Sequence, residues 1–213
     1  MLLSVFFSQT VVGYYSLGMR VSQLPITLIG GAIGQVFVQR AAEKRTSGED
    51  LAPLVGGLYK CLVSLGMLPS AVVVLIGPEL FGFVLGDRWV HAGTYVSILA
   101  PSLFFGLISS PLSSLCGVLQ RQGTGLFLSI SDLVFRVGAM LIGRFILVSS
   151  RGTILLLSVG SIIVRLQLLF FLFSWANLSY KSTLSHIGKN VIYIVPSLAI
   201  IAAAKWLIML PSQ

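Results

Sequence analysis

The sequence predicts an all-α integral membrane protein, a helical bundle of about six transmembrane helices, and three observations support this fold class. Apolar residues make up 56% of the 213-residue chain, charged residues only 9%, and the mean hydropathy is +0.98. A soluble domain carries about 25% charged residues, so this chain cannot cover a water-facing surface. The apolar segments are also long and continuous, unlike the alternating segments of about 10 residues that build outer-membrane barrels.

The first complete span is expected over residues 11–38, where Arg20 is the only charged side chain. At about 1.5 Å per residue, this run is long enough to cross a hydrocarbon core of about 30 Å. Pro25 lies in its middle and is expected to kink the helix, because proline lacks a backbone N–H. The glycines that follow Pro25 would let a neighbouring helix approach closely. A polar loop is expected at residues 40–53, with a helical extension of the first span at its start as the alternative.

Further apolar runs follow, each bounded by a short polar segment. Deformations are expected near Gly66 and Pro69 in the second span, and breaks at Pro101 and Pro111 in the third. The expected spans after the first cover residues 54–85, 90–119, 126–148, 153–175 and 191–210. Residues 1–8 are too short to span a membrane and are expected to be the tail of a truncated helix. All 213 residues are expected to form a single transmembrane domain.

The distribution of Lys and Arg predicts the orientation, because these residues are enriched in cytoplasmic loops. More of them lie in the segments 40–53, 121–125 and 177–189 than in the turns on the opposite side. These three segments are therefore expected to be cytoplasmic. The net charge of +8 is spread along the chain rather than gathered in one patch, so no nucleic-acid partner is expected.

No pattern typical of an enzyme is present in the sequence. Apart from the adjacent Glu49 and Asp50 in the expected polar loop, there is no closely spaced pair of acids, and there is no His/Cys ligand cluster, no phosphate-binding glycine loop and no Gly-x-Ser-x-Gly motif. His91 and His186 are each isolated near a predicted membrane surface. We therefore expect no catalytic residue, no metal site and no cofactor, and we do not expect the chain to be an enzyme.

Charged side chains inside the predicted spans are the candidate functional residues, because an Arg at a helix centre costs about 2.5–3.5 kcal/mol on insertion scales. Arg20, Arg136 and Arg165 lie near mid-depth and are the candidate substrate-binding residues. Asp132 precedes Arg136 by one helical turn and is expected to form an ion pair with it. Arg144, two turns further along the same span, is a supporting candidate together with Asp132.

If Asp132 neutralises one of these arginines, the others leave a surplus of positive charge at mid-depth. Guanidinium groups bind phosphate oxygens through paired hydrogen bonds, so such a cavity would suit a diphosphate head group. The same arginines could instead pair with backbone carbonyls, with Asp132, or with lipid phosphates near the surface. The sequence leaves these alternatives open.

Three segments resemble a family of membrane transporters: VGYYSLGMRVSQLPITLIGGAIGQVFVQRAAE, GPELFGFVLGDRW and YVSILAPSLFFGLISSPLS. Their most specific features are the Tyr-Tyr-Ser triplet at 14–16 with Arg20 and Pro25, and the elbow from Gly-Pro-Glu-Leu-Phe to Gly-x-x-Trp. They resemble the polysaccharide transporter branch of the multidrug/oligosaccharidyl-lipid/polysaccharide flippase superfamily, which contains the O-antigen and exopolysaccharide flippases. The resemblance is strong over residues 10–120 and weaker beyond.

The resemblance implies a carrier with two six-helix lobes, in which a central cavity moves a lipid-linked oligosaccharide by alternating access. This chain matches only the second lobe, so it is expected to be a fragment that needs a missing N-terminal lobe or a second copy. The implied substrate is a polyprenyl-diphosphate-linked oligosaccharide for O-antigen, lipopolysaccharide or exopolysaccharide. The implied location is the bacterial inner (cytoplasmic) membrane, in contact with membrane lipids.

Three other interpretations remain. A multidrug or cation antiporter of the same superfamily would need a free membrane carboxylate, whereas Asp132 is expected to be paired. An inactive truncated membrane scaffold would move no lipid. An integral-membrane glycosyltransferase is disfavoured, because the loops carry no acidic metal-binding motif.

Overall fold

The computed structural model describes residues 7–178, and this part of the chain is helical without strands, which confirms the all-α fold class. Its elements are α2 (Gln9–Thr46), α3 (Ala52–Leu85), η1 (Asp87–Trp89), α4 (Val90–Ser113), α5 (Leu115–Val118), α6 (Gln122–Ile142), η2 (Gly143–Leu147) and α7 (Ser150–Trp175). Within these residues, five helical segments are long and apolar enough to cross a membrane. The sixth expected span, 191–210, and most of the expected helix tail at 1–8 lie outside the described residues.

Helix α2 extends beyond the expected first span at its carboxyl end. Ser8 caps its start, with the side-chain oxygen accepting a hydrogen bond from Val11 N at 3.5 Å. The helix continues through Pro25 to Thr46, so residues 40–46 form the helical extension, and the loop before α3 is limited to residues 47–51. Strong helix formers occupy this last part, and its basic side chains suit the negative end of the helix dipole. At 1.5 Å per residue, the helix is about 57 Å long, well beyond the thickness of a bilayer core.

The deformation of the second span lies at a different place from the one predicted. Gly66 and Pro69 lie inside α3, whereas the non-helical backbone angles occur at Ile76 (φ −125°, ψ 20°). Pro78 explains this position, because its ring crowds the carbonyl four residues earlier and it has no N–H to donate. Gly66 instead permits close packing, since a Cβ there would lie 2.6 Å from Leu107 Cδ2.

The third span is also more regular than predicted. Helix α4 passes through both Pro101 and Pro111 and ends just after the second proline, where the short helix α5 begins. The expected break at Pro101 is therefore wrong. Pro111 is buried against α2, where a Cβ at Gly34 would lie 3.7 Å from its Cα. Helical proline is tolerated in such surroundings because neighbouring helices and side chains compensate the lost backbone hydrogen bond.

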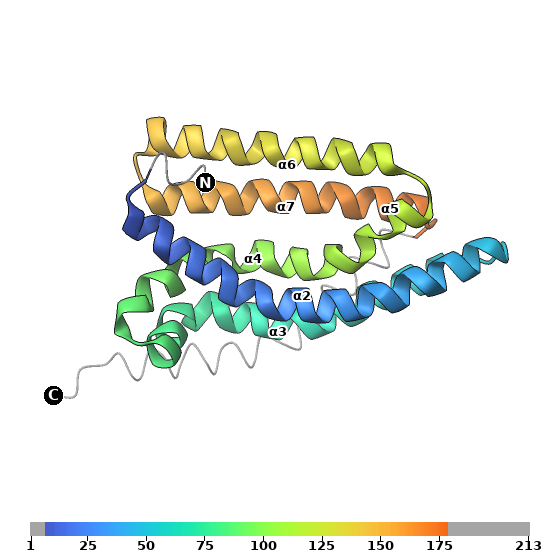
Figure 1. Cartoon of the computed structure of the whole chain (residues 1–213), viewed down its shortest axis with the longest axis horizontal. Helices are drawn as coiled ribbons and strands as arrows, with labels where there is room; N and C mark the ends of the chain where they lie inside the picture. The colour runs from blue at the N-terminus through green and yellow to red at the C-terminus, as the bar shows by residue number, and fades with distance from the viewer. Residues whose placement is uncertain (1–6, 179–213) are drawn as a thin grey trace.

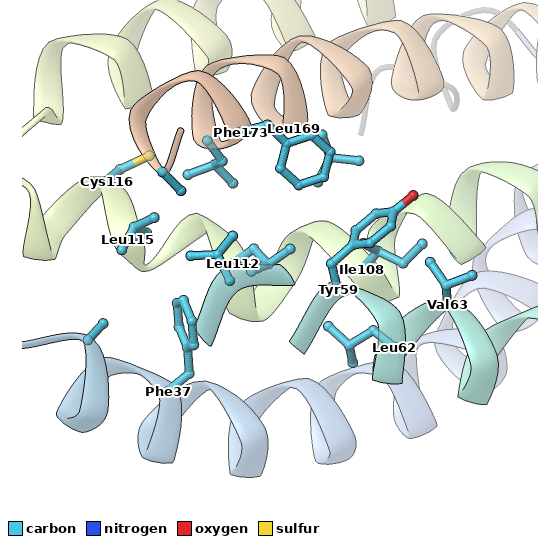
Figure 2. Close-up of a cluster of buried hydrophobic side chains, with 14 of the residues drawn as sticks. Phe37, Tyr59, Leu62, Val63, Ile108, Leu112, Leu115, Cys116, Leu169 and Phe173 are labelled. Atoms are coloured by element: carbon cyan, nitrogen blue, oxygen red, sulfur yellow. The ribbon is translucent and has the colours of Figure 1, made fainter. Parts of the chain in front are cut away.

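Helix α4 forms the centre of the bundle and packs against α2, α3 and α7 (Figure 1). The largest cluster of buried apolar side chains joins these helices (Figure 2). In this cluster, Tyr59 of α3 meets Phe173 of α7 edge to face, with 5.1 Å between the ring centroids. Ile108 and Leu112 of α4 are fully buried beside them. This core fixes the position of α7 relative to α4, and with it the position of the polar residues that lie further along both helices.

Helix α6 lies on the outside of the bundle and packs mainly along α7 (Figure 1). Helix α2 meets this pair near its own start, where Val12 and Tyr15 pack against a cluster of Ala139, Met140 and Leu157. From that contact, α2 runs away from α6 towards its Thr46 end (Figure 1). The two helices are therefore close at one end of the bundle and apart at the end that carries the turn between α5 and α6.

Candidate functional site

A pocket of about 520 Å³ lies among α4, α5, α6 and α7. It contains Asp132, Arg136 and Arg165, three of the charged residues that the sequence singles out. The other lining residues are hydroxylic, small or apolar: Ser109, Ser110, Ser113, Cys116, Gly125, Leu128, Ser129, Val164 and Leu168. At 1.5 Å per residue, Arg136 lies about 21 Å from the start of α6 and Arg165 about 15 Å from the end of α7. Both arginines therefore lie towards the middle of their helices, with the Arg136 side chain half exposed and Arg165 partly buried.

The guanidinium of Arg165 lies against the backbone of α4 at Gly106. A Cβ at Gly106 would lie 3.1 Å from Nη1 and 3.2 Å from Cζ, closer than the usual separation of about 3.5–4.0 Å. Nη1 donates a hydrogen bond to Ser109 Oγ at 3.1 Å, whereas Nε is buried and has no hydrogen-bond partner. Within residues 7–178, no carboxylate forms an ion pair with Arg165. A charge desolvated in this way is unfavourable unless an anion or water compensates it.

The expected ion pair between Asp132 and Arg136 is present. Arg136 Nε lies 2.6 Å from Asp132 Oδ2, and the two residues are one turn apart on α6. Their side chains remain 50% and 32% exposed, respectively, so the pair is accessible from the pocket. Arg165 is close enough to interact electrostatically with both. Two guanidinium groups and one carboxylate thus share the pocket, which leaves one positive charge in excess.

Serine hydroxyls surround these charges. Ser113 Oγ donates to Ser110 O at 2.7 Å, and Ser129 Oγ donates to Gly125 O at 2.9 Å. Each hydroxyl donates its hydrogen to a backbone carbonyl of its own helix. Its oxygen can therefore still accept a hydrogen bond from another donor. Such bonds to the backbone are common in membrane helices, but here the serines line the same pocket as the charged side chains and add hydrogen-bond acceptors to it.

Arg20 lies apart from this pocket. It is exposed on α2 and is not among the residues that line the pocket. Its spacing to Ser16, Gln23 and Thr27 places all four on one face of an otherwise apolar helix. Thr27 Oγ1 donates back to Gln23 O at 3.1 Å, as hydroxyls in membrane helices often do. The substrate-binding role of Arg20 stays a prediction.

Arg144 is also outside the pocket. It is exposed on η2, the π-helical end that follows α6, about 12 Å along the helix axis from Arg136. Its supporting role stays a prediction. The fold thus brings together Asp132, Arg136 and Arg165, and leaves the other two arginines elsewhere.

Three neighbours of the charged residues escape an analysis of the sequence alone. Gly106 and Ser109 hold Arg165, but a glycine and a serine one turn apart are common in membrane helices and give only a weak signal. Tyr15 packs beside Met140, within electrostatic range of the Asp132 carboxylate. This contact joins α2 to the pair of α6 and α7, which are far from it in the chain, and no spacing in the sequence indicates it.

These features show the class of the protein, which is a helical membrane bundle with a charged pocket among its apolar helices. Residues 1–94 match a family model described as polysaccharide biosynthesis protein. This match confirms the resemblance to the polysaccharide transporter family over that part of the chain and supports a role in polysaccharide biosynthesis or export. No curated protein and no solved structure matches the chain. The matched residues cover α2, α3 and the start of α4, so the pocket residues of α6 and α7 lie outside them.

Proposed function

We propose that this chain is a flippase component that binds the diphosphate of a polyprenyl-linked oligosaccharide and helps to carry it across the bacterial inner membrane. The carried unit would serve O-antigen or exopolysaccharide synthesis. The observation that carries the proposal is that Arg136 and Arg165, from two different helices, line one pocket towards the middle of those helices. The family match of residues 1–94 supports the polysaccharide part of the proposal.

The chemistry of the pocket suits a diphosphate. A guanidinium group binds phosphate oxygens through two parallel hydrogen bonds, and two such groups can hold two phosphoryl units. Arg165 has a buried Nε without a partner, and only a neutral hydroxyl compensates its Nη1. Folding has already removed the Arg165 guanidinium from water. An anion that binds there therefore meets a preorganised donor that needs no further desolvation.

The arrangement of the helices favours entry from one end. The pocket continues from Arg136 and Arg165 towards Gly125 and Leu168, which is the end where α2 and α6 are apart (Figure 1). The predicted orientation puts that end in the cytoplasm. In an alternating-access cycle, the contact of Tyr15 with the Met140 cluster at the opposite end would have to open for release.

A cation antiporter is the second candidate, and the geometry disfavours it. Such a carrier needs a membrane carboxylate that is free to bind a proton or a cation. In the described part of the chain, the carboxylate in this pocket is Asp132, and it lies 2.6 Å from Arg136 Nε. The excess positive charge of the pocket would also repel a cationic drug.

The test reconstitutes the full chain in liposomes and measures the movement of a fluorescent polyprenyl diphosphate between leaflets. Arg136→Ala and Arg165→Ala are each expected to lower the initial rate at least about tenfold, equivalent to an increase of about 1.4 kcal/mol in the free-energy barrier to transport. Arg144→Ala is the matched control, because it removes an exposed arginine outside the pocket, and its rate should stay within about twofold of wild type.

Each other outcome has a distinct meaning. Equal rates for the wild type and both pocket variants would remove the pocket from the mechanism. A wild-type chain that is folded and abundant, yet moves no lipid, would contradict transport by this chain alone and support either the inactive scaffold or the need for a second lobe. Thermal unfolding in detergent shows that each variant is folded before its rate is compared.

A further inference from the structure

A second polar pocket lies at the other end of the bundle, where the start of α2 meets the turn between α3 and α4 (Figure 1). Its volume is about 300 Å³, and it is lined by Thr10, Gly13, Tyr14, Arg88 and Trp89. Gly86 creates the turn, because its φ of 95° lies in the region that favours glycine. The chain therefore leaves α3 sharply, and the next residues, in η1, come to lie beside α2.

Two aromatic rings form the apolar part of this pocket. Tyr14 and Trp89 meet edge to face, with 5.9 Å between centroids and planes at 85°. Both rings pack on the cluster of Phe81, Ala92 and Val96, which holds them in place. Aromatic rings with a polar group suit a wet membrane boundary, and the ring surface that Arg88 and His91 leave uncovered can pack against the C–H groups of a sugar ring.

Arg88 and Thr10 supply the hydrogen-bonding groups. The Arg88 guanidinium lies over the Trp89 ring, with Cζ 5.3 Å from the ring centroid. This cation–π contact restricts the orientations that the guanidinium can adopt. The guanidinium offers five N–H donors, whereas the Thr10 hydroxyl both donates and accepts. Both side chains are exposed, so their polar atoms are available to a ligand. A ligand with an apolar ring face and a rim of hydroxyls matches this combination.

Gly13 provides the space for that ligand. No atom of the described residues lies within 4 Å of a Cβ built at this position. The absence of a side chain at Gly13 therefore leaves the pocket open rather than serving a close helix contact. A larger residue here can fill the pocket without displacing the fold.

We propose that this pocket binds a single pyranose ring of the carried oligosaccharide at the end of the bundle opposite the cytoplasmic opening. The source of the sugar rests on the proposed function, whereas the site itself can be tested with free sugars. Tyr and Trp are also common at membrane boundaries without any ligand, and the test separates that situation from a binding site.

The test uses the full chain with Trp175→Phe and Trp206→Phe, which leaves Trp89 as the only tryptophan. Its fluorescence is titrated with glucose, galactose and N-acetylglucosamine, and at least one sugar is expected to give a saturable change with a Kd in the millimolar range. Gly13→Leu is expected to weaken this binding at least about tenfold by filling the pocket. Arg88→Lys is expected to weaken it several-fold, because lysine lacks the planar fork.

Gly57→Leu is the matched control, because a Cβ at Gly57 also meets no atom within 4 Å. Gly57 lies in the first half of α3, outside the pocket. It should bind the sugar as the parent does. The proposal is overturned if none of the three sugars gives a saturable change, or if Gly13→Leu binds as tightly as the parent. The proposal is also overturned if inorganic phosphate changes the Trp89 fluorescence, the sugars do not, and Arg88→Lys keeps the phosphate response. That result would assign the pocket to a lipid head group. This titration involves neither Arg136 nor Arg165, so the site and the proposed function can fail separately.

Discussion

Gly106 on α4 offers a sharp test of the way in which Arg165 is held. Replacing glycine with alanine inside a helix normally stabilises it by about 1 kcal/mol. Here the new Cβ would lie 3.1 Å from Arg165 Nη1, 3.2 Å from Cζ and 3.4 Å from Nη2. Ordinary contact distances are about 3.5–4.0 Å, so the guanidinium must move by about 0.5 Å.

That displacement is enough to remove the hydrogen bond from Arg165 to Ser109. The bond is 3.1 Å long, and at about 3.6 Å it would no longer qualify as one. A hydrogen bond to a charged group contributes about 1.5–3 kcal/mol when buried, and partial exposure of Arg165 reduces this towards the lower value. After the gain in helix propensity is subtracted, Gly106→Ala should lower the free energy of unfolding by about 0.5–1 kcal/mol.

The functional assay is the binding of farnesyl diphosphate, a short polyprenyl diphosphate, to the purified chain in detergent. Gly106→Ala should weaken binding about five- to tenfold, because the displaced guanidinium no longer points into the pocket. Ser109→Ala removes the same hydrogen bond without adding a Cβ and should give a similar loss. Gly57→Ala makes the same substitution where nothing lies within 4 Å and should leave binding unchanged. If Gly106→Ala binds like Gly57→Ala, the contact between α4 and Arg165 has no part in recognition.

Three further predictions concern other parts of the structure. Asp132→Asn removes the carboxylate that competes with an anionic ligand for Arg136, so farnesyl diphosphate should bind about five- to tenfold more tightly. Weaker binding would mean that Asp132 mainly positions the arginine. Gly93→Ala should destabilise the fold by about 1–3 kcal/mol in thermal unfolding, because the new Cβ would lie 2.7 Å from the Pro78 Cα. A backbone atom cannot move aside as a side chain can. A melting temperature equal to that of Gly57→Ala would contradict this prediction. Leu112→Ala should cost about 2–5 kcal/mol in the same measurement, since the side chain is fully buried in the core, and a loss below 1 kcal/mol would show that the cavity collapses.

Local patterns explain which expectations agree with the structure. The helical fold class follows from composition, because an apolar chain in a bilayer must satisfy its backbone hydrogen bonds within each segment. The ion pair of Asp132 and Arg136 follows from spacing, because residues four apart on a helix are neighbours whatever surrounds them. The last turns of α2, at 40–46, are polar and yet helical, and the polarity of this segment alone could not decide between a loop and a helical extension.

Deformations at proline were less predictable than the helices themselves. Pro69 and Pro101 lie within continuous helix, whereas the backbone departs from helical geometry at Ile76, before Pro78. Each proline removes the same hydrogen bond, so the sequence cannot rank them. The packing of neighbouring helices decides which of these positions bends.

By itself, the sequence determined that this protein is a helical membrane bundle, where its described helices approximately lie, and that charged groups are placed within them. Only the tertiary structure decided that Arg165 meets Gly106 and Ser109, that it shares a pocket with Arg136, and that Arg20 lies outside this pocket. The physical reason is that helical periodicity states which residues share a face of one helix. Which other helix that face meets depends on the rotation and crossing of whole helices, and the buried core around α4 sets both.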